Sequence, residues 1–140
     1  MKKRKLLFLL VLLIIIITIS NVVTNLSNKN KFNKEFNALL GLREELIIKI
    51  KNNEIQLDEY KFAKLPEEYK RVAKNGRVRV FVNDIENTLI GFLYRPGFPD
   101  EDQYIFYTTN DDKFIKEQIG VSLIYNIEKI TENWYFVQYN

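Results

Sequence analysis

The stretch Asn75–Asp84, NGRVRVFVND, is where the periodicity of the chain changes, and it decides the fold. Before Gly76, apolar residues recur every three or four positions, which is typical of helices. After Gly76, small and large side chains alternate, which predicts a strand with two distinct faces. One face carries Val78, Val80 and Val82, and the other carries Arg77, Arg79 and Phe81. We therefore expect helices before this stretch and a sheet after it.

Four more strands are expected downstream, each bounded by turn residues. They are Thr88–Arg95, Gln103–Thr109, Val121–Ile130 and Trp134–Tyr139. Pro96 and Pro99 end the second strand, because proline cannot donate to a strand ladder. A helical turn is expected at Lys113–Gln118. Short connections between consecutive strands predict an antiparallel meander of about five strands, and hence an α+β domain.

Two helices are expected upstream of the sheet. Pro66–Lys74 is a short helix with acidic residues in its first turn and a left-handed stop at Asn75-Gly76. Lys31–Lys51 carries an apolar stripe, formed by Phe32, Phe36, Leu39, Leu40, Leu46, Ile47 and Ile50. This stripe favours a helix that packs on the sheet. The alternative is a coiled-coil stalk that forms a dimer.

An apolar run near the N-terminus has the length and composition of a membrane-spanning helix. Residues Leu6–Val23 carry no charge and are mostly Leu, Ile, Val and Phe. A helix of this length measures about 27 Å, close to the thickness of a hydrocarbon core. The four basic residues before Leu6 favour a cytoplasmic N-terminus and an exported C-terminal part. The alternative is a cleaved signal peptide, although no Ala-x-Ala site follows the run.

The sequence thus predicts four segments of a single-pass protein of the cell membrane. They are a cytoplasmic basic tip (1–5), a transmembrane anchor in the lipid bilayer (6–23), a juxtamembrane link (24–30) and an exported α+β domain (31–140). The frequent Lys, Asn, Ile, Phe and Tyr fit an AT-rich bacterial genome.

The formal net charge of +3 comes from the basic tip. Of the 21 basic residues, four precede Leu6, which leaves 17 against 18 acidic residues. The exported part is therefore nearly neutral, so nucleic acid is not an expected partner. The chain has neither cysteine nor histidine, which excludes disulfides, thiolate metal sites and a Ser-His-Asp triad. We expect no catalytic residue, no metal site and no cofactor.

Aromatic residues are frequent in the predicted sheet, and alternation directs some of them outward. Exposed Tyr and Trp beside arginine are typical of protein-binding surfaces. The predicted binding surface consists of Arg77, Arg79, Arg95, Tyr104, Trp134 and Tyr135. The alternative is that the aromatic residues fill the core, because they are also good strand formers.

The favoured interpretation is a membrane-tethered interaction domain that binds another protein or a second copy of itself. One alternative is a small envelope-directed hydrolase with two carboxylates across a cleft. The acidic stretch Asp100–Asp102 lacks the spacing of a calcium loop and is typical of a solvated turn. A further alternative is an accessory subunit of a membrane complex.

Two resemblances add to this interpretation. The features of the first are Leu65-Pro66-Glu67-Glu68-Tyr69, Gly76 before the first strand, Arg95 with Gly97 after the second, and the terminal Trp134-Tyr135. Together they resemble a group of small membrane-anchored bacterial proteins over residues 65–139, and this resemblance implies no activity. The succession of apolar helix, long helix and antiparallel sheet is also similar to type IV pilins. Those proteins have glycine and glutamate where this chain has Lys5 and Leu10, so this similarity is architectural.

Overall fold

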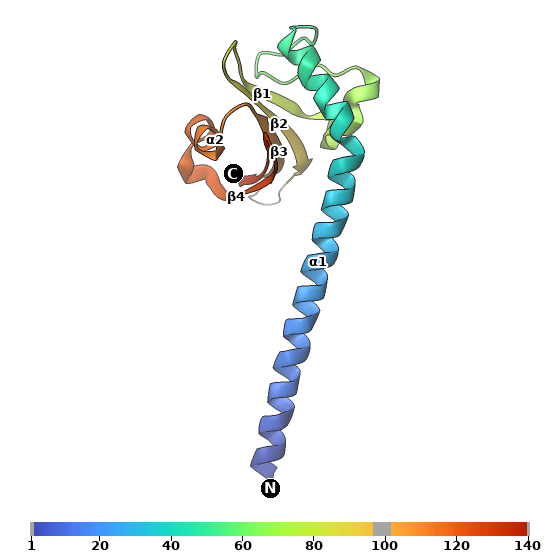
Figure 1. The fold of residues 1–140 in the computed structure, drawn as a ribbon, viewed down its shortest axis with the longest axis vertical. Helices are drawn as coiled ribbons and strands as arrows, with labels where there is room; N and C mark the ends of the chain where they lie inside the picture. Colours follow the sequence, from blue (N-terminus) through green and yellow to red (C-terminus); the bar gives the residue numbers. More distant parts are fainter. Residues whose placement is uncertain (1, 97–101, 140) are drawn as a thin grey trace. The chain divides into compact units, whose positions relative to one another are not determined.

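The computed structural model describes residues 2–96 and 102–139, and side chains from residue 9 onward. The helices are α1 (Lys2–Lys51) and α2 (Asp112–Ile119), with short 3-10 helices at Glu67–Val72, Lys74–Gly76 and Val121–Leu123 (Figure 1). The strands are β1 (Val78–Asn83), β2 (Thr88–Arg95), β3 (Asp102–Thr108), β4 (Ile124–Thr131) and β5 (Trp134–Tyr139). The fold is α+β with a five-stranded antiparallel sheet, as the sequence predicts. The chain divides into two units after Leu40.

Helix α1 continues without interruption from Lys2 to Lys51. Residues 24–30, which the sequence suggested as a link, are helical, because they contain no glycine or proline to end the helix. The Thr24 hydroxyl instead donates to the carbonyl oxygen of Ser20 at 2.8 Å, within the helix. Large apolar side chains from Leu9 to Leu26 are 44–60% exposed. Among the described residues, α1 is the one helix long and apolar enough to cross a membrane.

The last turns of α1, Gly41–Lys51, belong to the second unit and cover one face of the sheet. Leu46, Ile47 and Ile50 are at most 3% exposed. The Asn83 side chain of β1 donates to the carbonyl oxygen of Ile50 at 3.2 Å. This part of the helix therefore packs on the sheet, as its apolar stripe predicts.

Arg43 interrupts that apolar stripe and is nevertheless buried. Its Nε donates to the carbonyl oxygen of Val72 at 3.0 Å, and its guanidinium carbon lies 5.8 Å from the centre of the Phe92 ring. Burial lowers the pKa of Arg43 to about 10, so the side chain is still protonated at neutral pH. A buried arginine thus ties the helix to the segment that precedes the sheet.

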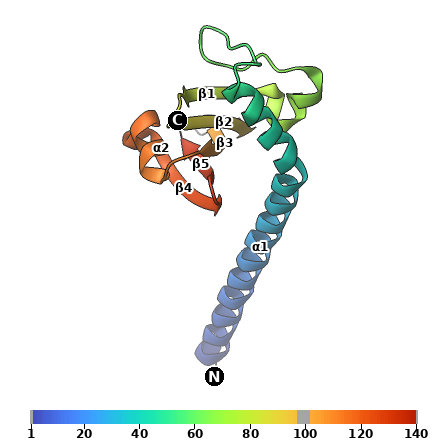
Figure 2. The same ribbon diagram turned by 45° about the horizontal axis from the view of Figure 1, so that its top comes forward.

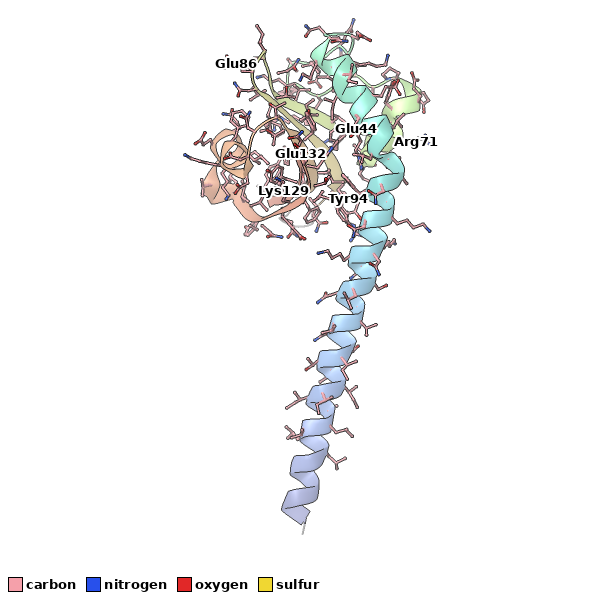
Figure 3. The ribbon with its side chains drawn as sticks, in the orientation of Figure 1. Glu44, Arg71, Glu86, Tyr94, Lys129 and Glu132 are labelled. Carbon is pink, nitrogen blue, oxygen red and sulfur yellow. The ribbon has the colours of Figure 1, made fainter. Side chains whose placement is uncertain are left out.

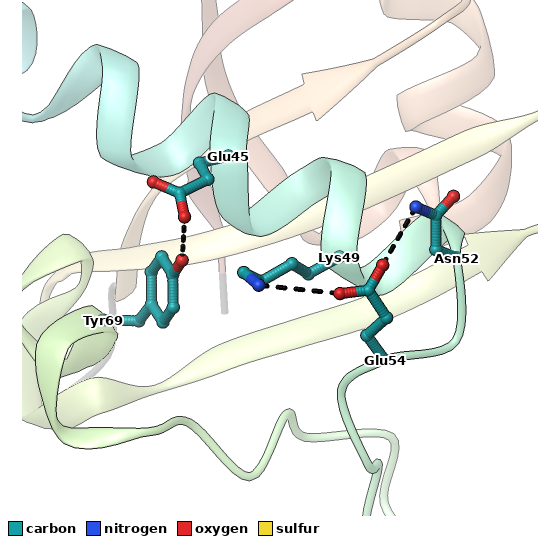
Figure 4. Close-up of polar contacts among 5 residues, drawn as sticks. All are labelled: Glu45, Lys49, Asn52, Glu54 and Tyr69. Carbon is teal, nitrogen blue, oxygen red and sulfur yellow. Dashed lines mark hydrogen bonds and ion pairs between the residues drawn. The ribbon is translucent and has the colours of Figure 1, made fainter.

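Further polar contacts hold the same end of the helix in place (Figure 4). The Tyr69 hydroxyl donates to the Glu45 carboxylate, and this hydrogen bond raises the pKa of Tyr69 to about 12. Lys49 and Glu54 form an ion pair at 3.5 Å, and the side-chain amide of Asn52 donates to Glu54 at 3.0 Å. Residues 67–72, expected as a helix, form the tighter 3-10 helix and present Tyr69 to α1.

The strand order is β1-β2-β3-β5-β4, and all neighbouring strands are antiparallel. A simple meander would place β4 beside β3, and this part of the prediction is wrong. Strand β4 carries Asn126, Glu128 and Lys129 and is mostly exposed, whereas β5 is mostly buried. Charged and polar residues suit an edge strand. The final hairpin therefore folds back so that β5 lies in the sheet interior.

The centre of the sheet is buried on both faces. In β2, neighbouring residues point to opposite faces, yet Leu89, Ile90, Phe92 and Leu93 are all at most 1% exposed. Helix α2 covers the face of Leu89 and Leu93 through the fully buried Ile115. The end of α1 covers the face of Phe92 (Figure 2). We call these the α2 face and the α1 face.

Short polar side chains set the turns that hold the sheet together. A carboxylate oxygen of Asp84 accepts from the backbone N–H groups of Glu86 and Asn87, which closes the β1–β2 turn. Asp111 accepts from the N–H of Phe114 at 3.1 Å and caps α2. Both contacts lie between predicted strands, where turn residues were expected.

Two features expected from the sequence lie mostly outside the described residues. They are the strand break at Pro96–Pro99, of which Pro96 is described, and the acidic stretch Asp100–Asp102, of which Asp102 begins β3.

Gly91 is required by close packing on the α2 face, and Gly91→Ala tests this. An added Cβ would lie 2.8 Å from Phe106 Cε1 and 3.2 Å from Phe81 Cε2. We expect Gly91→Ala to lower the free energy of unfolding by about 1–3 kcal/mol. The measurement is urea unfolding of the full chain in detergent micelles, followed by the fluorescence of the single tryptophan.

Gly41→Ala is the matched control, because nothing lies within 4 Å of its added Cβ and the site is helical. It should raise stability by up to about 1 kcal/mol. Equal effects of the two substitutions would contradict the packing argument.

Candidate functional site

Three of the six residues predicted to form a binding surface lie in the core. Tyr104, Trp134 and Tyr135 are 3, 3 and 6% exposed, so they are not surface residues. Trp134 packs on the α1 face, with its ring 5.7 Å from that of Phe92. Tyr104 and Tyr135 belong to the core cluster of the α2 face. The prediction of exposure is wrong because helices cover both faces of the sheet. Strand alternation therefore decides only whether an aromatic residue is buried on the α1 face or on the α2 face.

The three predicted arginines lie at or near the surface. Arg77 and Arg95 are exposed, and Arg79 is half-buried. The Arg95 guanidinium lies 5.3 Å from the ring of its neighbour Tyr94. Arg77 and Arg79 contact aromatic residues that are distant in sequence or on the same strand, and they form the centre of the candidate site.

Arg77 and Arg79 lie on the α2 face, because Arg79 is directly opposite Gly91 in the β1–β2 ladder. The Arg77 guanidinium carbon lies 5.0 Å from the centre of the Phe62 ring. The Arg79 guanidinium carbon lies 5.7 Å from Phe62 and 4.8 Å from Phe81. These are cation–π distances, which orient both guanidinium groups.

The backbone of residues 61–63 brings Phe62 to this position. Phe62 forms an isolated bridge with Arg79, and the N–H of Val80 donates to the carbonyl oxygen of Lys61 at 2.9 Å. The segment therefore lies along the outer edge of β1. We use the name arginine corner for the group of Phe62, Arg77, Arg79, Phe81, Tyr104 and Tyr139.

Neither arginine of the corner has an ion-pair partner among the residues that the structure describes. The Nε of Arg79 is buried there and has no hydrogen-bond partner. A buried donor without an acceptor costs about 1–3 kcal/mol. The corner therefore keeps a positive charge and a donor that the described part of the fold does not use.

Two tyrosines adjoin the arginines. The rings of Tyr104 and Tyr139 are 5.1 Å apart, and their side chains share a hydrogen bond. Burial raises the pKa of both tyrosines, while the charge of Arg79 opposes the rise in both. Both therefore remain neutral phenols at neutral pH. The polar groups of the corner thus supply N–H and O–H donors, which suits the binding of an acceptor.

The sequence pattern indicates the arginines of the corner and Phe81. Alternation placed Phe81 on the same strand face as Arg77 and Arg79, and this signal was sufficient. Tyr139 was visible as one of several aromatic residues in the last strand. No sequence pattern indicates Phe62, because it lies in an irregular segment and its position follows from an isolated bridge to β1.

No protein-family model matches this chain, and neither does any curated protein or solved structure. Within the described ranges, no group of three or more acidic side chains is placed to hold a metal ion.

Arg79→Met separates a functional role of Arg79 from a structural one. Methionine keeps the contact with Phe62 and Phe81 but removes the unsatisfied Nε. We expect the free energy of unfolding to stay equal or to rise by about 1 kcal/mol, because the lost cation–π energy is smaller than the recovered desolvation cost. Urea unfolding of the full chain in micelles measures this.

Arg43→Met is the control, since it leaves the carbonyl oxygen of Val72 without this donor and should cost about 1–3 kcal/mol. If Arg79→Met costs as much as Arg43→Met, then Arg79 is a structural residue.

Proposed function

We propose that this chain is a single-pass membrane protein whose exported domain binds a partner protein through the arginine corner. The observation that carries the proposal is the pair of guanidinium groups of Arg77 and Arg79, which have aromatic support and no ion pair among the described residues. Arginine beside aromatic rings is typical of binding hot spots. Because the rings already orient the guanidinium groups, binding costs less conformational entropy.

Helix α1 is the anchor in this proposal. Its apolar side chains from Leu9 to Leu26 are exposed, which would be unfavourable in water and suits a bilayer. The basic residues at positions 2–5 favour a cytoplasmic N-terminus. The domain would then lie outside the cytoplasm, in the bacterial setting of the proteins that the sequence resembles.

An uncleaved anchor predicts that the full chain stays in the membrane fraction. Mass spectrometry of that fraction from the protein's own host should find the intact chain of 16.7 kDa. Protease added to cells without an outer barrier should digest the domain and leave an N-terminal fragment. A shorter soluble form whose sequence begins after the apolar run would contradict the anchor.

Site-specific photo-crosslinking tests the partner. A photoreactive residue at Lys74, which is exposed and precedes Arg77 by three residues, should form a discrete adduct in living cells of the host. The same residue at Glu86, at the tip of the β1–β2 turn, should not (Figure 3). Adding Arg77→Gln and Arg79→Met should remove the Lys74 adduct.

Mass spectrometry of the adduct identifies the partner, and an adduct of twice the chain mass would identify a second copy. Monomer alone at position 74 would contradict the proposal, and so would an adduct that survives the double substitution.

A further inference from the structure

The arginine corner presents two guanidinium groups, which are hydrogen-bond donors, on one face of the sheet. Arg77 and Arg79 are two positions apart on β1, so their backbones are separated by about 7 Å on the same face. A guanidinium group offers parallel N–H donors that match the two oxygens of a carboxylate. Two such groups at this spacing can donate to one planar anion from two directions.

The orphan Nε of Arg79 indicates where an acceptor is missing. In a bidentate contact, a guanidinium group donates through two neighbouring N–H groups to two oxygens. The Nε of Arg79 is buried without a partner among the described residues, although its ring contacts hold the guanidinium in place. This Nε is itself shielded from solvent, so an incoming carboxylate would meet the exposed guanidinium of Arg77 and the accessible part of the half-buried Arg79 side chain.

Two neutral phenols, Tyr104 and Tyr139, adjoin the arginines and add no negative charge to the corner. Asp102 acts electrostatically on both tyrosines, but no ion pair joins it to either arginine of the corner within the described structure.

We propose that the arginine corner binds one carboxylate of the partner protein, held by the guanidinium groups of Arg77 and Arg79. This inference rests on the proposed function, which supplies a protein partner. It names the chemistry of contact, namely an acidic side chain or a C-terminal carboxylate that approaches from the exposed side of Arg77.

The overall charge favours a single carboxylate over a polyanion. Residues after position 5 carry 17 basic against 18 acidic side chains, so no broad positive field surrounds the corner. Binding of a polyanion depends on many such charges and on the release of counterions. Two arginines flanked by phenylalanine rings suit one planar, singly charged group better.

Nuclear magnetic resonance of the full chain in lipid nanodiscs tests this, with sodium acetate as the probe. The Nε–Hε signal of Arg79, assigned with Arg79→Lys, should move on addition of acetate and reach saturation. Sodium chloride at the same ionic strength should not move it. The signal of Arg71, an exposed arginine outside the corner, should stay in place (Figure 3).

Three variants make the test specific. Arg77→Gln should raise the acetate dissociation constant roughly tenfold, because a charge-assisted hydrogen bond is lost. Arg77→Lys keeps the charge and should raise it less. Arg71→Gln should leave it unchanged. Since Arg77 and Arg71 are exposed, these variants should fold. An immobile Arg79 signal, an equal response to chloride, or an equal effect of Arg71→Gln would overturn the inference.

The outcome is distinguishable from that of the proposed function. If acetate leaves Arg79 unaffected while the Lys74 crosslink still forms and needs both arginines, the inference fails and the partner-binding function stands. If acetate binds at Arg79 but no adduct forms in cells, the carboxylate site stands and the protein partner is wrong.

Discussion

Burial of β2 on both faces is the constraint on which the rest of the structure depends. Its apolar residues alternate between the faces and are all excluded from water, so each face needs a cover. Helix α2 covers one face, and the end of α1 covers the other. The helix that carries the exposed apolar run therefore also completes the domain core. Removing residues 41–51 would therefore open the α1 face of the second unit.

The parts of the fold that the sequence predicts are those where a local rule acts alone. The strands Thr88–Arg95 and Trp134–Tyr139 have the predicted bounds, because turn residues delimit them on at least one side. Strand order is a property of the whole sheet, and the rule of consecutive neighbours misplaced β4. The polarity of β4 was a usable signal, since Glu128 and Lys129 favour an edge. The continuity of α1 through residues 24–30 follows equally from the absence of a helix breaker there.

The candidate site was predictable for its charges and less so for its aromatic residues. Arginine is rarely buried without a partner, which agrees with the exposed positions of Arg77 and Arg95 but not with the buried Nε of Arg79. Tyrosine and tryptophan fit both surface and core, and their place depends on whether a helix covers the strand face. Tyr104, Trp134 and Tyr135 are buried for this reason. The contribution of Phe62 depends on a bridge between an irregular segment and β1, and no local pattern encodes such a bridge.

Arg43 and Arg79 show how the fold treats the same side chain in two ways. Both have a buried Nε near an aromatic ring, but that of Arg43 donates to the carbonyl oxygen of Val72, whereas that of Arg79 has no acceptor in the described structure. The fold can therefore satisfy a buried guanidinium group with its own backbone. An unsatisfied one costs stability, and such costs are characteristic of binding sites, where the partner supplies the missing group. The difference between these two arginines is the physical reason why we propose a binding role for Arg79 and a structural role for Arg43.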